Sequence, residues 1–516
     1  MIRPAIALLT ALAVFVPLSI AQADVTLPNV IGSNMVLQRD IPLNIWGWAT
    51  PGEKVTVTLG DAKVDATAND AGEWKAKLPP QKSGGAPLEM TVAGKNTIKL
   101  TNILIGEVWV GSGQSNMEWS VSNSNNPKEE IAGANFPKIR LFLVSLVPSG
   151  EPARDVNASW KECSPATVPS FSAVLYFFGR DIHKELDVPV GLIATSWGGT
   201  RIEPWIPPAG FASEKDLKGE GENVAKVQAA YQQAVKTQLP AFKAWLESAE
   251  KSATAGQPIA PPPSLPKHPL NSNGQPTGLY NGMVHPIAPF GIRGALWYQG
   301  ESNLGQGMKY YTLMRGLVQG WREVWGQGEF PFLFTQLAPY KYGAKETALP
   351  EIWEAQTASL QIPNTGMAVL TDITNLTDIH PRNKQDVGKR LARWALNKTY
   401  GKTDVVVSGP LYDSKVVEEG RIKIKFKHAE GMKARDDKPL TWFAIAGDDK
   451  LFVQAEATIE GDTIVVQSPK VPKPLAVRFG WHQLAEPNLV NKAGLPASPF
   501  RTDDWTDAAS APLPGK

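Results

Sequence analysis

A serine and a histidine that lie far apart in the chain carry the strongest chemical signal. Ser115 belongs to the segment 111–117 (GSGQSNM), and His380 belongs to 378–381 (DIHP). A serine hydroxyl is a weak nucleophile and needs an adjacent base. A neutral imidazole is the usual partner, because its ordinary pKa of about 6.5 lets it take and return a proton at neutral pH. Together the two residues predict acyl transfer to serine.

Two further segments could donate hydrogen bonds to the negative charge that develops on an acyl oxygen. The turn at 196–200 (SWGGT) leaves backbone N–H groups accessible, and 299–303 (QGESN) adds the side-chain amides of Gln299 and Asn303. Such donors matter, since losing one typically costs on the order of 3 kcal/mol of transition-state stabilisation. The sequence therefore offers a nucleophile, a base and oxyanion donors.

Other kinds of site are not indicated. The serine segment lacks the last glycine of the G-x-S-x-G nucleophile elbow, because Met117 stands there. It also matches neither glycine-rich phosphate-binding pattern. The sequence has no H-E-x-x-H motif and no cluster of histidines and cysteines, so we expect no metal site.

Each of these segments lies behind a short apolar run that reads as a strand. Apolar residues at helical spacing separate the runs, for example along 314–324 and 387–395. Alternating strands and helices indicate a parallel sheet covered on both faces. Ligands of such sheets bind beyond the carboxyl ends of the strands, so we expect the segments to meet at one edge. The candidate strands are 108–110, 191–194, 295–298, 332–334 and 367–370.

The same patterns divide the mature chain into three regions. Residues 24–103 and 401–516 alternate in the manner of β-strands, whereas 104–400 carries the strand–helix alternation. Within the middle region, an insertion around 210–275 combines helical spacing with a proline-rich stretch, and we expect Pro240 to kink or restart its helix. The insertion is either a cap beside the site or a surface excursion.

The amino terminus has the pattern of a signal peptide. Arg3 precedes an apolar run, and the small-x-small sequence at 21–23 fits a cleavage site, so we expect 1–23 to be removed and the protein to be periplasmic or secreted. No later run approaches the roughly 20 apolar residues of a membrane span, so no membrane partner is expected after cleavage. With 52 Lys and Arg against 50 Asp and Glu, nothing indicates a nucleic-acid partner.

Four segments in this order resemble the blocks of the sialate O-acetylesterases, a family of the SGNH hydrolase superfamily, and related acetylxylan esterases carry similar blocks. The segments are 113–117 (GQSNM), 198–200 (GGT), 297–303 (WYQGESN) and 378–381 (DIHP). The resemblance covers most of the mature chain. It implies an α/β fold in which a flavodoxin-like, three-layer, parallel-sheet core is flanked by N-terminal and C-terminal β-sandwich-like domains.

The resemblance also implies roles for individual residues. Ser115 corresponds to the nucleophile and His380 to its general base. The oxyanion hole corresponds to the backbone N–H groups of Ser115 and Gly199, with the side chain of Gln299 or Asn303. Enzymes of this kind need no metal and no organic cofactor. The expected activity is serine-dependent removal of acetyl groups from sugars.

The acid that orients His380 is the point where the sequence departs from the superfamily pattern. Many SGNH enzymes place it three residues before the histidine, where this chain has Thr377. We therefore expect Asp378, two residues before, to take the role if the loop turns suitably. Asp372 and Glu301 are alternatives, and a dyad without an acid is a third, since the acid mainly fixes the tautomer and orientation of the ring.

The sequence leaves the substrate partly open. O-acetylated sialic acids are the first expectation, and acetylated hemicellulose, such as xylan or xyloglucan, is the second. A non-catalytic carbohydrate-binding protein is the third. For substrate contacts we predict Trp197, which could stack on a sugar ring, and Arg201, which could pair with a sialic acid carboxylate.

Overall fold

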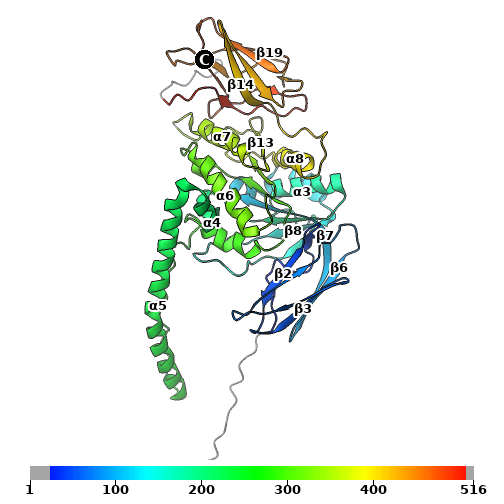
Figure 1. The fold of residues 1–516 in the computed structure, drawn as a ribbon, viewed down its shortest axis with the longest axis vertical. Helices are drawn as coiled ribbons and strands as arrows, with labels where there is room; N and C mark the ends of the chain where they lie inside the picture. The colour runs from blue at the N-terminus through cyan, green and yellow to red at the C-terminus, as the bar shows by residue number, and fades with distance from the viewer. Residues whose placement is uncertain (1–23, 344, 507–516) are drawn as a thin grey trace, which may run out of the picture.

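The computed structural model describes residues 24–343 and 345–506, so the predicted signal peptide at 1–23 lies outside the described residues. Figure 1 shows three parts along the long axis of the molecule: an amino-terminal β region, an α/β region in the middle and a carboxyl-terminal β region at the far end. In the described part of the chain, no helix is long and apolar enough to cross a membrane.

The middle part is built on a sheet whose strands run parallel apart from one at its edge. Strand β9 pairs antiparallel with β8, and the other neighbours are parallel. The spatial order is β13-β12-β11-β7-β10-β8-β9. The strands are β7 (Thr97–Gly113), β8 (Phe136–Leu143), β9 (Trp160–Cys163), β10 (Val190–Ala194), β11 (Gly294–Tyr298), β12 (Phe332–Thr335) and β13 (Thr365–Ala368). Each predicted strand of the core overlaps one of these.

Helices lie on both faces of this sheet. Successive side chains of a strand point to opposite faces, so the apolar strands need helices on both sides to bury them. On one face, Phe332 meets Trp321 of α6, with ring centres 5.8 Å apart. On the other face, Gly366 pairs in register with Leu333 and lies against the ring of Trp394 in α8. The core therefore has three layers. Its helices are α3 (Ala173–Leu186), α6 (Lys309–Trp325), α7 (Ala348–Ala358) and α8 (Lys384–Trp394).

The order of the strands differs from the flavodoxin-like order that we expected. In that order the first strand lies between the second and the third. Here β10 takes the inner place, because it hydrogen-bonds to β7 on one side and to β8 on the other. Short apolar runs show where strands lie but carry no information about which neighbours they choose, so the sequence could not give this order.

The amino-terminal region is continuous with the core through β7. That strand pairs with β6 over its first part and with β10 and β11 over its last part. The predicted boundary at 103/104 therefore falls inside a strand, and apolar side chains of both parts form one buried cluster. The other strands of the region are β1 (Val36–Gln38), β2 (Leu43–Trp48), β3 (Lys54–Leu59), β4 (Ala62–Thr67), β5 (Glu73–Leu78) and β6 (Leu88–Ala93).

A buried carboxylate lies at the junction of these two parts. Glu107 of β7 is fully buried and accepts hydrogen bonds from three side chains. Arg293 donates to it at 2.6 and 3.2 Å, Gln38 donates at 3.1 Å, and Arg39 pairs with it as well. Since a buried charge is costly unless it is paired and hydrogen-bonded, this arrangement supports the junction.

The predicted insertion forms α4 (Pro208–Ser213), the long helix α5 (Lys218–Thr254) and an irregular proline-rich stretch up to about residue 279. Figure 1 shows α5 extending away from the body of the molecule, and Val224 is its one buried residue. Our expectation for Pro240 was wrong in part, because α5 continues through it without a new start. The exposed helix has the character of a surface excursion.

The carboxyl-terminal region is all β. Two four-stranded sheets, in the orders β14-β15-β20-β19 and β18-β17-β21-β23, bury side chains in one shared apolar cluster that is separate from the core cluster. Arg501 holds the region to α7 through Glu354, at 2.8 and 2.9 Å. The strands are β14 (Leu411–Glu418), β15 (Arg421–Lys427), β16 (Lys433–Ala434), β17 (Phe443–Ala446), β18 (Val453–Gln454), β19 (Glu456–Glu460), β20 (Thr463–Gln467), β21 (Ala476–Phe479), β22 (Leu489–Val490) and β23 (Phe500–Arg501).

Candidate active site

Ser115 stands at the carboxyl end of β7, where the chain turns directly into the short helix α1 (Ser115–Glu118). Gly113 makes this turn possible. Its φ of +137° suits glycine, and a Cβ atom there would lie 2.1 Å from the carbonyl oxygen of Tyr298. The main chain of β7 can therefore approach β11 closely, and the half-buried Ser115 projects beyond the edge of the sheet.

His380 meets Ser115 from the loop between β13 and α8. Its Nε2 atom lies 2.9 Å from Ser115 Oγ. On the other side of the ring, Nδ1 lies 3.3 Å from Asp378 Oδ1, and the same carboxylate oxygen accepts a hydrogen bond from the His380 backbone N–H at 2.9 Å. The loop thus turns so that an acid two residues away can face the ring. Trp119 stacks on the imidazole, with ring centres 4.9 Å apart.

The surroundings of His380 favour its neutral form. Burial lowers its pKa below the ordinary value, the positive charge of Lys384 lowers it further, and Asp378 opposes both effects. A neutral imidazole with Nε2 facing a hydroxyl can accept the hydroxyl proton. The arrangement can therefore activate Ser115 at neutral pH.

The two other acids considered for His380 lie elsewhere. Asp372 binds the guanidinium of Arg390 through both oxygens, each at 2.7 Å. Glu301 accepts a hydrogen bond from Asn116 Nδ2 at 2.7 Å, and its other carboxylate oxygen is buried without a partner among the described residues. Neither acid contacts the His380 ring, so Asp378 alone of the three is placed to orient it.

The two backbone N–H groups of the predicted oxyanion hole have no acceptor among the described residues. Within the described residues, the N–H groups of Ser115 and Gly199 form no hydrogen bond. The neighbouring N–H of Gly198 is occupied, because it donates to Glu118 Oε2 at 2.5 Å. Gly199 has a φ of +72°, which a glycine adopts without strain, and a Cβ atom there would meet nothing within 4 Å. The two open groups match the predicted backbone part of an oxyanion hole.

The two side chains predicted to complete that hole are engaged with each other. Gln299 is fully buried, and its Nε2 donates to Asn303 Oδ1 at 2.7 Å and to the Thr200 carbonyl at 3.2 Å. Asn303 directs its own Nδ2 to Glu203 and Gln306, at 3.0 Å each. The two amides therefore link the turn at 196–200 to the segment that follows β11. Among the described residues, neither amide has a free N–H group for a substrate oxygen.

A buried polar network lies beneath the serine and histidine. Asn116 Oδ1 accepts a hydrogen bond from Lys384 Nζ at 2.5 Å, while its Nδ2 donates to Glu301 and to the Ile379 carbonyl at 3.1 Å. Lys384 is fully buried, and its ammonium lies over the Tyr298 ring at 5.3 Å. Asn116 thereby connects the turn at Ser115 with Glu301, which follows β11, and with the loop that carries His380.

Burial decides the charge states in this network. It lowers the pKa of Lys384 to about 7, against the opposing influence of Glu301 and Asp378. It also raises the pKa of the Glu301 carboxyl above its ordinary value. Both groups thus move toward their neutral forms, as expected for ionisable groups removed from water.

Ser115 and His380 share one cavity of about 690 Å³, which is within the usual size range of small-molecule sites. Two predicted substrate contacts are absent from its lining. Trp197 donates its backbone N–H to Gly113, and Arg201 pairs with Glu203 at 2.7 Å. The lining residues are Ser115, Glu118, Trp119, Ser120, Ser122, Asn123, Leu143, Val144, Ser145, Leu146, Ser170, Ser172, Ser196 and His380.

Three residues of the site were not predicted from the sequence. Trp119 and Lys384 each come four positions after a predicted catalytic residue, but this spacing is no helical signal, because α1 ends at Glu118 and α8 begins only at Lys384. Asn116 directly follows the serine. The roles of all three depend on contacts across the fold.

The chain is similar to known carbohydrate esterases. Residues 269–397 match the model of a carbohydrate esterase family described as sialic acid-specific acetylesterase. A sialate O-acetylesterase of Mus musculus is 33% identical over 424 residues, which are 74% of this chain and 75% of that protein. One of Homo sapiens is 29% identical over 453 residues, 80% of this chain and 78% of the relative.

A solved structure extends the likeness to the fold. It is the crystal structure of a carbohydrate acetylesterase from Xanthomonas citri, with 33% sequence identity and a TM-score of 0.79. The match covers 93% of this chain and 100% of that one, so it includes both β regions as well as the core.

Proposed function

The chain belongs to the sialate O-acetylesterase family, and we infer that it is a carboxylic ester hydrolase that removes O-acetyl groups from a carbohydrate. One observation carries the proposal for its mechanism. His380 Nε2 lies 2.9 Å from Ser115 Oγ in a cavity that can receive a small acyl group. A hydroxyl hydrogen-bonded to a neutral imidazole is the arrangement that nucleophilic catalysis on an ester requires.

In the first half of the proposed reaction, Ser115 Oγ attacks the acetyl carbonyl while His380 Nε2 accepts the hydroxyl proton. The carbonyl oxygen becomes an oxyanion, which the open N–H groups of Ser115 and Gly199 stabilise. The bond to the sugar oxygen then breaks, His380 returns its proton to that oxygen, and the sugar leaves with a free hydroxyl. Ser115 retains the acetyl group as an ester.

In the second half, a water molecule takes the place of the sugar. His380 accepts a proton from it, and the resulting hydroxide attacks the acetyl carbonyl on Ser115. The same two N–H groups stabilise the second oxyanion. Acetate leaves, and His380 returns the proton to Ser115 Oγ, which restores the starting state without a cofactor.

We assign positioning roles to the residues around this pair. Asp378 holds Nδ1 of His380, and Trp119 fixes the plane of the ring by stacking. Asn116 binds the Ile379 carbonyl and Lys384, and so ties the histidine loop to the serine turn. Such contacts matter because catalysis depends on holding the reacting atoms in alignment.

Replacing the nucleophile tests the mechanism. Ser115→Ala should lower the rate of p-nitrophenyl acetate hydrolysis by at least about 10⁴-fold, as removal of a serine nucleophile does in triad enzymes. Ser122→Ala is the matched control, because this exposed serine lines the same cavity and its hydroxyl hydrogen-bonds to the hydroxyl of Ser120. Activity retained by the Ser115 variant would refute the assignment.

A serine-reactive fluorophosphonate probe separates the enzyme from a non-catalytic carbohydrate-binding protein. The wild-type protein should become labelled at Ser115, and His380→Ala should be labelled far more slowly because its hydroxyl lacks a base. Failure of the wild-type protein to react would favour the non-catalytic alternative.

O-acetylated sialic acid is the substrate that the family favours, and one feature of the cavity favours an uncharged sugar as second candidate. Among the described residues that line the cavity, Glu118 is acidic and none is lysine or arginine. A sialic acid carboxylate is commonly bound by such a cation. Mass spectrometry of acetylated sialic acids and of acetylated hemicellulose oligomers after incubation decides between them.

We also propose that the protein is exported to the periplasm or secreted. The support is the signal-peptide pattern of residues 1–23. Amino-terminal sequencing of protein recovered from the periplasm or the medium should begin near Asp24, and an unprocessed amino terminus would contradict the proposal.

A further inference from the structure

A second cavity lies between the amino-terminal β region and the core, at the sheet edge opposite to Ser115. Its volume is about 590 Å³, similar to that of the catalytic cavity. Strands β2 and β5 form one wall, and the segments around Ala153 and Pro289 form the other. Since Pro289 comes shortly before β11 begins, the cavity lies near the amino ends of the parallel strands, whereas Ser115 follows a carboxyl end.

The strand wall presents tryptophans beside charged side chains. In the antiparallel pair of β2 and β5, Trp48 lies opposite Glu73 and Trp46 lies opposite Lys75. Residues directly opposite each other, and those two positions along, share one face of such a pair. Both tryptophans are half-buried, while Glu73 and Lys75 are exposed. This face therefore combines indole surface with hydrogen-bonding groups.

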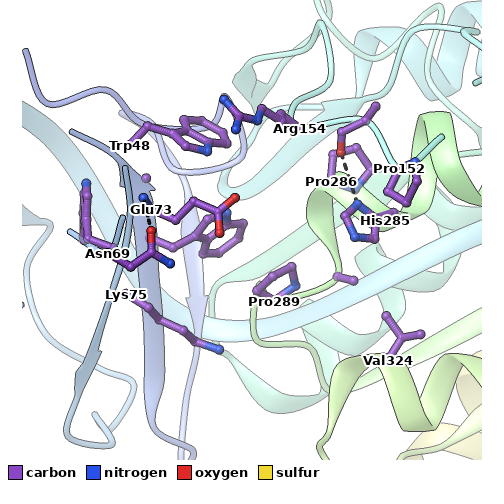
Figure 2. Close-up of a pocket in the computed structure, with 15 residues that line it drawn as sticks. Trp48, Asn69, Glu73, Lys75, Pro152, Arg154, His285, Pro286, Pro289 and Val324 are labelled. Carbon is purple, nitrogen blue, oxygen red and sulfur yellow. Dashed lines mark hydrogen bonds between the residues drawn. The ribbon is translucent and has the colours of Figure 1, made fainter. Parts of the chain in front are cut away.

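The facing wall adds a cation, an imidazole and proline rings. Figure 2 shows Glu73 extending toward His285 and Pro289 across the cavity, with Arg154 beside Trp48. The Arg154 guanidinium lies 5.9 Å from the centre of the Trp48 ring. His285 is fixed through Nδ1, which lies 3.1 Å from the Ala153 carbonyl. Its Nε2 atom is left without a partner in the described structure.

The charged groups of the cavity are not paired with one another. Within the described residues, the side chains of Glu73, Lys75 and Arg154 form no hydrogen bond and no ion pair, although both signs of charge are present. The Nδ2 group of Asn69 is open as well, since only its Oδ1 is used, by the backbone N–H groups of Ala71 and Glu73. Several donors and acceptors thus converge on one hollow without an internal partner.

We propose that this cavity, whose Trp48 indole adjoins the unpaired Glu73 and Arg154 side chains, binds a neutral oligosaccharide. A sugar ring carries C–H groups that pack on an aromatic face and hydroxyl groups that donate and accept hydrogen bonds around its rim. The unpaired Glu73 carboxylate accepts from such hydroxyls and the Lys75 and Arg154 side chains donate to them, so the two signs of charge together suit a ligand whose groups both donate and accept. A volume of this size has room for more than one ring.

Such a site goes beyond the proposed deacetylation and is independent of it in mechanism. It would hold a glycan chain on the side of the core away from Ser115. Binding there would raise the local concentration of acetylated chain segments near the catalytic cavity, as a second linked binding site does for any multivalent ligand. It would not alter hydrolysis of a small ester.

Isothermal titration calorimetry on the full-length Ser115→Ala protein tests the proposal without turnover. The probes are cellohexaose, xylohexaose and mannohexaose, with sialyllactose as the anionic comparison. We expect at least one neutral hexasaccharide to bind, and the added change Trp48→Ala to weaken its Kd by about tenfold or more, since it removes the stacking surface. Trp245→Ala is the matched control, because this tryptophan lies on α5 and bonds to Ala260.

Two outcomes would overturn the proposal: no neutral hexasaccharide binds, or binding is unchanged by Trp48→Ala. If that variant does not fold, Glu73→Gln and Arg154→Ala replace it, because both side chains are exposed and their loss leaves the core intact. Each should weaken binding several-fold. Hydrolysis of p-nitrophenyl acetate by Trp48→Ala with Ser115 present should equal that of wild type, which separates this test from the test of the proposed function.

Discussion

Two buried carboxylates at opposite edges of the same sheet have opposite surroundings. Glu107, at the junction with the amino-terminal region, is matched by Arg39 and Arg293 and by the Gln38 amide. Glu301, beneath Ser115 and His380, accepts a hydrogen bond from Asn116, and its other oxygen is buried without a partner among the described residues. Burial raises the pKa of Glu301.

The difference indicates what each carboxylate does. A charge that is paired on several sides supports the architecture, because removing it strands its partners. A carboxyl group held by a single neutral amide contributes little as a charge. The amide that binds it can instead fix the relative positions of the groups that it contacts. Asn116 is that amide, and it also contacts Lys384 and the histidine loop. Strongly perturbed groups tend to gather at functional sites for this reason.

The largest effect should follow from removing the charge of Glu107. Glu107→Gln leaves two guanidinium groups without their buried counter-charge, so we expect the free energy of unfolding to fall by roughly 3–5 kcal/mol. Urea unfolding followed by circular dichroism measures it. Glu185→Gln, which disrupts an exposed pair with Lys402, is the control and should change stability little. Equal effects of the two variants would contradict the comparison.

The next effect concerns how stability depends on pH through Lys384. Its pKa is about 7 in the folded protein against an ordinary 10.5. Between pH 7 and 10.5 the unfolded chain binds more protons than the folded protein. The free energy of unfolding should therefore rise with pH by about 1 kcal/mol per pH unit, and this gain should be lost as pH falls toward 7. Lys384→Met should remove this slope from urea unfolding curves recorded at pH 7 to 10.

The matched control for that slope is Lys389→Met on the same helix, since Lys389 is exposed. It should retain the wild-type slope. If the Lys384 and Lys389 variants behave alike, the lysine buried beneath the site does not titrate as inferred.

A smaller effect should appear in the pH profile of catalysis. The positive charge of Lys384 lowers the pKa of His380, in addition to the lowering caused by burial. Lys384→Met removes that charge, so the acid limb of kcat/KM for p-nitrophenyl acetate should move to higher pH. The limb should stay in place in Lys389→Met. A limb that moves to lower pH, or does not move, would argue against coupling of Lys384 to His380.

The smallest effect is expected at Glu301. Glu301→Gln keeps an oxygen that accepts from Asn116, so unfolding at pH 5 should change by no more than about 1 kcal/mol. The raised pKa of the wild-type carboxyl stabilises the folded state below about pH 4.5, and this contribution is lost as pH rises through the folded pKa. The variant should therefore gain stability relative to wild type as pH rises above about 4.5. A loss as large as that of Glu107→Gln would remove the distinction between the two carboxylates.

The sequence predicted the parts of the site that depend on local order. Each segment of the candidate site was predicted to follow a strand, and the structure brings Ser115, Gly199 and His380 to one edge of a parallel sheet. The sequence left Asp378, Asp372 and Glu301 open as partners of His380, because the contact depends on how the loop before the histidine turns. Gln299 and Asn303 have the right chemistry for oxyanion donors, but their amides are used by each other and by neighbouring chain.

Long-range features were less accessible from the sequence. The strand order places β10 between β7 and β8, and no local pattern encodes a choice of neighbour. The boundary predicted at 103/104 falls inside β7, because this strand does not end where its residue character changes. The buried position of Lys384 was hidden because a lysine in a polar segment normally reads as exposed.

The unbroken course of β7 has a consequence for how the molecule unfolds. Its amino-terminal half pairs within the amino-terminal β region and its carboxyl-terminal half leads to Ser115, the proposed nucleophile. Both halves contribute to a single apolar cluster, while the far β region has a cluster of its own. On heating, the first two parts are expected to melt as one cooperative unit and the third as another. Esterase activity would then be lost in the same transition that dissolves the amino-terminal sheet.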